Sequence, residues 1–175
     1  MRVVTRTLLG LAFGPALFFS GQALAGPMVC EDAPAGEKLK IEGFVREGLR
    51  VFQKALSTVS GIEAESTLAG LTIVEAEMEA IRLGISTDEI PQIAAMYGAY
   101  IGEVIRSEAD ACWTSEDELP EALRLGAPIV RATGPSGDGQ FAMTVSTAWQ
   151  HLENGAEDSP SFAVRALLAR FKDAD

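Results

Sequence analysis

The residue in this sequence best placed to do chemistry is Glu103, which lies in an apolar segment close to Tyr97, Tyr100 and Arg106. A carboxylate in such surroundings is either a structural anchor or a general acid or base with a raised pKa. As an anchor it would pair with Arg106 or with the indole N–H of Trp113. We expect the structural role. The competing hypothesis is a hydrolase that uses Glu103 in a cleft.

Other residue types that are typical of catalysis are sparse. His151 is the single histidine of the chain, so a metal site with two histidines cannot form. It lies near the end of an expected helix, where we predict a surface residue or one that satisfies the helix dipole, rather than a catalyst. No serine lies in a G-x-S-x-G elbow, and residues 134–139 lack the lysine and the following helix of a phosphate-binding loop. The sequence therefore predicts no catalytic residue and no cofactor.

An acidic run, Glu116-Asp117-Glu118, precedes a proline. Such a run binds calcium when oxygen ligands alternate around a glycine turn and a bidentate glutamate follows. That spacing is absent, so we predict a solvated loop and no metal site. An acid from 116–118 is a second candidate for the hydrolase alternative.

Two cysteines, Cys30 and Cys112, are present in the chain. Two cysteines in one small exported domain most simply pair, and the alternative is two free buried thiols. A bridge over a loop of this length would stabilise the fold by roughly 4–5 kcal/mol in the chain-entropy model. Neither cysteine has a partner at metal-ligand spacing, so the sequence predicts a structural disulfide.

The first 25 residues have the pattern of an export signal. Arg2 and Arg6 precede an apolar stretch over 8–19, and Ala23-Leu24-Ala25 follows as a small-x-small cleavage site. The apolar stretch is shorter than the about 20 residues that a bilayer span needs. We therefore expect cleavage after Ala25, a periplasmic or secreted protein, and no stable membrane insertion.

Cleavage after Ala25 would leave 150 of the 175 residues, the size of one domain. We expect a lead-in segment over 26–36 and one globular domain over 37–175. Removing the two arginines of the leader leaves 12 basic and 25 acidic residues, a net charge of −13. This charge disfavours nucleic acid and anionic lipid as partners. It reflects either solubility alone or an acidic face that docks a basic partner.

Three amphipathic helices should position these groups. Apolar residues recur at helical spacing, with charged residues between them, over about 37–59, 68–81 and 88–107. A capping box is predicted before the third helix, in which the Ser86 hydroxyl meets the Glu89 amide and the Glu89 carboxylate reaches back.

The third helix carries small residues on one face. Ala94, Gly98 and Gly102 fall on one line, four residues apart. A glycine inside a helix costs about 1 kcal/mol relative to alanine. Two of them on one row indicate that another element packs very close to this backbone.

After Asp110 the helical period is lost. Short strands are predicted over 112–114, 127–133 and 140–144, with a turn over 134–139, and these would form a small antiparallel sheet. A short helix over 145–153 should end in a left-handed cap at Asn154-Gly155, and a last helix should begin at Pro160. The predicted fold class is α+β and helix-dominated, with three N-terminal helices, the sheet, and two C-terminal helices.

The stretch from Tyr97 to Arg106 reads Y-G-A-Y-I-G-E-V-I-R and is followed by Trp113. Together with Asn154-Gly155 and Asp158-Ser159, it resembles a pattern of small, uncharacterised bacterial domains, over roughly residues 86–173. Some of those domains neutralise bacterial toxins, so the resemblance implies protein binding rather than catalysis. His151 stands where the pattern has a basic residue, and no catalytic residue transfers.

The function that we expect is binding, most plausibly to another protein, in an immunity-like or regulatory role. The candidate interaction or structural residues share aromatic or buried-acid character: Tyr97, Tyr100, Glu103, Trp113 and Trp149. An exposed aromatic among them would anchor an interface, whereas a buried one belongs to the core. A third hypothesis is a structural envelope protein, for which the sign would be an extended exposed apolar patch. The sequence does not fix the oligomeric state.

Overall fold

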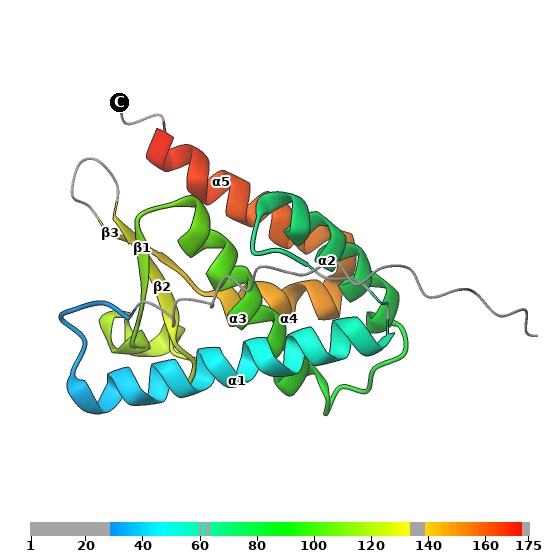
Figure 1. The fold of residues 1–175 in the computed structure, drawn as a ribbon, viewed down its shortest axis with the longest axis horizontal. Helices are drawn as coiled ribbons and strands as arrows, with labels where there is room; N and C mark the ends of the chain where they lie inside the picture. Colours follow the sequence, from blue (N-terminus) through cyan, green and yellow to red (C-terminus); the bar gives the residue numbers. More distant parts are fainter. Residues whose placement is uncertain (1–28, 60, 62–63, 134–138, 173–175) are drawn as a thin grey trace, which may run out of the picture.

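A computed structural model describes residues 29–59, 61, 64–133 and 139–172 (Figure 1). Within this part of the chain the fold is the predicted helix-dominated α+β architecture. Three helices come first, a three-stranded antiparallel sheet follows, and two helices complete the domain. The elements are α1 (Ala35–Val59), α2 (Leu68–Arg82), α3 (Ile90–Glu108), β1 (Ala111–Thr114), β2 (Ile129–Thr133), β3 (Gly139–Ala142), α4 (Thr144–Asn154) and α5 (Pro160–Lys172).

The central helix is α3, whose residues from Tyr97 to Ile105 are all buried. It contacts α4 and α1 most extensively and also touches α2, α5, β1 and β2. Figure 1 shows α1 running along one side of α3, with the sheet at the end of the molecule where α1 begins. A helix covered on every side needs apolar or small residues all round, and that is the composition of this segment.

The predicted close packing along the glycine row of α3 is confirmed. A Cβ atom added at Gly98 would lie 2.7 Å from the Cα atom of Val145 in α4. One added at Gly102 would lie 2.1 Å from the ring of Trp113 in β1. Each distance is shorter than van der Waals contact, so only glycine lets α4 and the tryptophan approach this closely.

A third close approach, at Gly48 in α1, was not predicted. A Cβ atom there would lie 2.6 Å from the Cβ atom of Ala99. The two helices therefore approach closely at Gly48, where α1 has no side chain.

The sheet has the order β1-β2-β3, and both pairings are antiparallel. Trp113 pairs with Val130, which in turn pairs with Ala142. Trp113 and Val130 are fully buried, so this row lies on the core face of the sheet. Before α1, Val29 forms a parallel bridge with Trp113, and the Cys30 amide donates to the Trp113 carbonyl at 2.8 Å. The described part of the lead-in is therefore attached to β1.

Two predicted caps differ from the structure in detail. The Glu89 carboxylate accepts from the Ser86 amide at 2.8 Å, as predicted, but the Ser86 hydroxyl also donates to that carboxylate instead of capping the Glu89 amide. Gly155 has the positive φ expected after α4, 77°, but its ψ of −144° lies outside the left-handed helical region. The capping box leads directly into α3, and Gly155 begins a short 3-10 helix, Gly155–Asp158. The predicted turn over 134–139 lies almost wholly outside the described residues.

Candidate functional site

Glu103 is a buried carboxylate, 7% exposed, in the middle of α3. Its Oε1 atom accepts the indole N–H of Trp113 at 2.8 Å. The Arg106 guanidinium, one helical turn further on, donates from Nε at 3.1 Å and from Nη2 at 3.0 Å. The sequence named these two groups as alternative partners, and the structure brings both to the same carboxylate.

This arrangement gives Glu103 a structural role. Both carboxylate oxygens accept hydrogen bonds from donors of the fold itself, and Glu103 does not line the two hollows beside α1 and α5 that border on α3. Removal of one partner from such a buried pair leaves a charge without compensation, at a cost of about 3–5 kcal/mol. The cluster therefore fixes α3 to β1.

The two tyrosines that the sequence singled out belong to an aromatic cluster with Phe52 of α1. The Phe52 ring lies 4.4 Å from that of Tyr100 in a stacked arrangement and 5.6 Å from that of Tyr97, edge to face. The Tyr100 hydroxyl donates to the Glu65 carbonyl at 2.7 Å. Tyr97, Tyr100 and Trp113 are buried, so they are core residues rather than exposed anchors. Trp149, in α4, is partly buried against the core.

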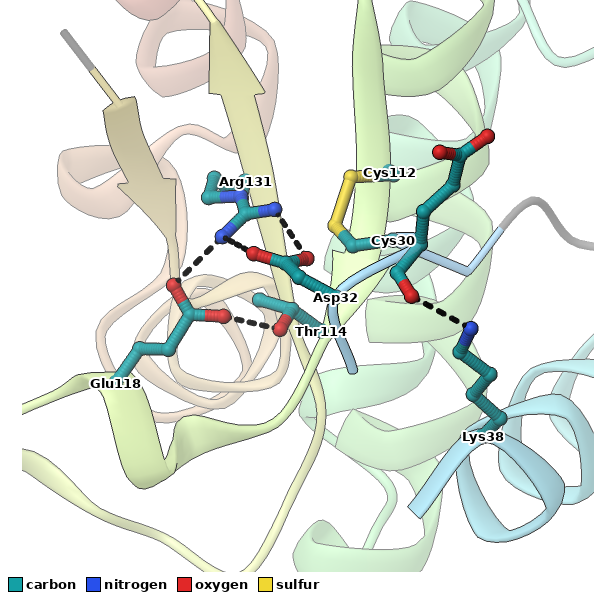
Figure 2. Close-up of a disulfide and its surroundings, with 8 residues drawn as sticks. Cys30, Asp32, Lys38, Cys112, Thr114, Glu118 and Arg131 are labelled. Carbon is teal, nitrogen blue, oxygen red and sulfur yellow. Dashed lines mark hydrogen bonds and ion pairs between the residues drawn. A yellow bond between two sulfur atoms is a disulfide. The ribbon is translucent and has the colours of Figure 1, made fainter. Parts of the chain in front are cut away.

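The predicted bridge between Cys30 and Cys112 is present, with Cα atoms 5.1 Å apart. Figure 2 shows it beside an ionic cluster in which the Arg131 guanidinium lies between two carboxylates. Arg131 donates to Asp32 at 2.7 and 2.9 Å and to Glu118 at 3.1 Å. The hydrogen bond from Arg131 lowers the pKa of Asp32 below its ordinary value. Covalent and ionic contacts thus hold the segment before α1 on the sheet, and the disulfide indicates an oxidising compartment.

The acidic run 116–118 is more ordered than the solvated loop that we predicted. Glu116 accepts the backbone amides of Leu125 and Gly126 at 2.6 and 2.8 Å. Glu118 accepts from the Thr114 hydroxyl in addition to Arg131. These carboxylates close the loop between β1 and β2, a role that depends on tertiary partners and therefore leaves no local signal in the sequence.

The prediction that His151 faces solvent is wrong, because its side chain is 1% exposed. The last turn of α4 packs against α2 and the short turn before α5, which covers the imidazole. Its Nδ1 atom lies 3.2 Å from the Asp158 carbonyl. Its Nε2 atom has no hydrogen-bond partner within the described residues and lies 3.9 Å from the Glu79 carboxylate. Glu79 is itself held by Arg82 at 2.6 Å.

An open hollow of the described surface lies between α1 and α3, with α2 at one end. It consists of two adjoining parts of about 250 and 230 Å³ that share Val51, Gln92 and Met96. We call it the α1/α3 groove. Its principal apolar lining residues are Val51, Phe52, Leu56, Ile81, Ile93 and Met96.

Few polar groups line this groove. At the α2 end lie the half-buried carboxylate of Glu77 and Tyr97, and the other part of the groove is lined by Glu47, which accepts hydrogen bonds from Arg50. Burial and the negative charge of Glu77 raise the pKa of Tyr97 to about 12, so the phenol keeps its proton at neutral pH. The groove thus combines an apolar floor with two carboxylates, one of them paired with Arg50, a combination that the sequence did not predict. The groove is lined by residues of three helices. Helical periodicity predicts only that most of these residues are buried in the core.

No known protein family, no curated protein and no solved structure matches this chain. Within residues 29–172, as far as they are described, no three histidine, cysteine or acidic side chains gather as metal ligands. The described helices include none with the length and apolar character needed to cross a bilayer.

Proposed function

We propose that this protein is an exported domain that acts by binding another protein, and that the α1/α3 groove is its binding surface. The observation that carries the proposal is a contrast between two places. The carboxylate that a hydrolase would use, Glu103, has all its partners inside the fold, whereas the groove leaves apolar surface open to solvent. Apolar surface with a polar rim is the composition of interface centres.

The acidic composition supports a protein partner over other macromolecules. A formal net charge of −11 for the whole chain disfavours nucleic acid and anionic membranes. It favours a partner with a basic surface, because opposite charges raise the association rate and exclude wrong partners. The disulfide fits a site of action outside the cytosol.

The specific form that we favour is neutralisation or regulation of a partner, as in the immunity-like domains that the Tyr97–Arg106 segment resembles. Such a role requires a rigid surface and no reactive group. The close contacts at Gly98 and Gly102 supply that rigidity, because they pack α3, the inner wall of the groove, directly against the α4 backbone at Val145 and against the Trp113 ring of β1.

Photo-crosslinking in the native cell tests this proposal. Gln92 is exposed and lines both parts of the groove, so a benzoylphenylalanine placed there should capture one defined protein. Gln53, exposed on α1 but outside the groove, is the matched control position. The captured protein, once purified, should bind the wild-type domain directly. Equal labelling from both positions, or no protein adduct at Gln92, would overturn the proposal.

A further inference from the structure

The acidic end of the α1/α3 groove contains a carboxylate that the fold leaves without a counter-charge. Glu77 is half-buried, yet it forms no ion pair or side-chain hydrogen bond with any residue that the structure describes. Its neighbours on the same helix and on α3 differ in this respect. Glu79 is paired with Arg82 at 2.6 Å, and Glu103 with Arg106 at 3.0 Å.

The position of Glu77 beside Tyr97 makes this carboxylate part of a polar pair. Tyr97 is 5% exposed and lines the groove. Its hydroxyl is not one of the fully buried polar atoms that lack a partner. A carboxylate and a phenol oxygen, both able to accept hydrogen bonds, therefore stand at one end of an apolar floor.

Such an arrangement matches a long cationic side chain better than any other protein group. Lysine and arginine bury their aliphatic stems along apolar surface while the charged head reaches a polar tip. A half-buried carboxylate without an ion-pair partner can form a favourable ion pair with a cation, because folding has already removed part of the water around the carboxylate. A second copy of this chain is a poor occupant, since two strongly acidic domains repel each other.

We infer that the α1/α3 groove takes an amphipathic helix of a basic partner, whose apolar face lies along the partly exposed side chains of Val51, Ile93 and Met96 and whose flanking lysine or arginine pairs with Glu77. This inference rests on the proposed function and specifies the partner's chemistry. A helix in a groove between two helices is a recurrent mode of recognition, with anchors at helical spacing. The two adjoining hollows between α1 and α3, of about 250 and 230 Å³, provide the space.

Isothermal titration calorimetry with two synthetic helices tests the inference. One helix carries leucine on one face and lysine on the other, and its counterpart carries glutamate in place of lysine. The lysine helix should bind the wild-type domain with one-to-one stoichiometry, and the glutamate helix should not. Glu77→Gln should weaken binding about fivefold, the size expected for one partly exposed ion pair. Glu153→Gln, which removes the same charge from an exposed position on α4, should leave the affinity unchanged.

The outcomes separate this inference from the proposed function. No binding of the lysine helix, equal binding of the glutamate helix, or an unchanged affinity of the Glu77→Gln variant would overturn the inference. If a protein is nevertheless captured at Gln92, the groove remains a protein-binding surface with a different occupant. If no protein is captured at Gln92 either, the inference and the proposed function are both overturned. Thermal melting of each variant verifies that the fold is intact.

Discussion

Replacement of Gly98 by alanine tests the close contact between α3 and α4 with the smallest possible change. The added Cβ atom would lie 2.7 Å from the Val145 Cα atom and 2.9 Å from its backbone nitrogen. Because these are backbone atoms of a packed helix, the contact cannot be relieved by rotation of a side chain. Either α4 moves as a rigid body, or the new methyl group keeps its steric overlap with the Val145 backbone.

The expected change in the free energy of unfolding is the sum of two opposing effects. Overpacking in a dense core costs typically about 1–3 kcal/mol, and relief by movement of a whole helix lies at the upper end. Alanine returns about 1 kcal/mol because it is a better helix former than glycine. We therefore expect a net loss of about 1–2 kcal/mol in the free energy of unfolding, with a larger loss for Gly98→Leu.

Gly43 supplies the matched control. It is exposed in the interior of α1, and a Cβ atom added there would meet nothing within 4 Å. The same glycine-to-alanine change should stabilise the protein by about 0.5–1 kcal/mol. Urea unfolding followed by circular dichroism measures both variants. The reasoning is refuted if Gly98→Ala unfolds at the wild-type urea concentration, or if the two substitutions shift the midpoint in the same direction.

Three further predictions concern covalent processing and pH. Mass spectrometry of the exported protein should show a chain that begins at Gly26, and an intact Met1 or a lipid adduct would contradict the export signal. Non-reducing peptide mapping should recover Cys30 linked to Cys112, and replacement of both by alanine should lower the free energy of unfolding by about 2–4 kcal/mol; free thiols in the native protein would reject the bridge. Burial, aided by the charge of Glu77, raises the pKa of Tyr97 from 10.0 to about 12. The contribution of the protonated phenol to the free energy of unfolding is therefore fully present below about pH 10. It is lost as the pH rises to about 12, at roughly 1.4 kcal/mol per pH unit. Tyr97→Phe should therefore flatten the alkaline loss of stability, and an unchanged pH profile would show that this phenol does not titrate differently on unfolding.

Most of the fold could be predicted from local patterns. The three long helices have clear apolar periodicity, and Ser159 and Pro160 mark the start of α5, where the Ser159 hydroxyl accepts the Phe162 amide at 3.1 Å. The glycine row of α3 predicted close contact because glycine has no other advantage inside a helix. Glu103 was recognised from its apolar surroundings, although the choice between Arg106 and Trp113 needed the structure.

The features that were missed depend on contacts between distant segments. Burial of His151 is determined by how α4 packs against α2, which no pattern around residue 151 reveals. Glu116 acts on amides about ten residues away, across a loop whose path is not encoded in local spacing. The α1/α3 groove is lined by residues of α1 and α3 together with Glu77 of α2. Periodicity identifies an apolar face of each helix but does not show which part of that face stays open to solvent.

The most direct test of the account compares two variants for binding to the protein captured at Gln92. Ile93→Asp introduces a charge into the floor of the α1/α3 groove, whereas Glu103→Gln changes the buried carboxylate but keeps an oxygen that can accept the Trp113 indole N–H. We predict that Ile93→Asp weakens binding by about tenfold or more, while Glu103→Gln keeps the wild-type affinity. Full affinity in Ile93→Asp together with loss of function in a folded Glu103→Gln variant would contradict the account, because the buried carboxylate and not the groove would then be the functional site.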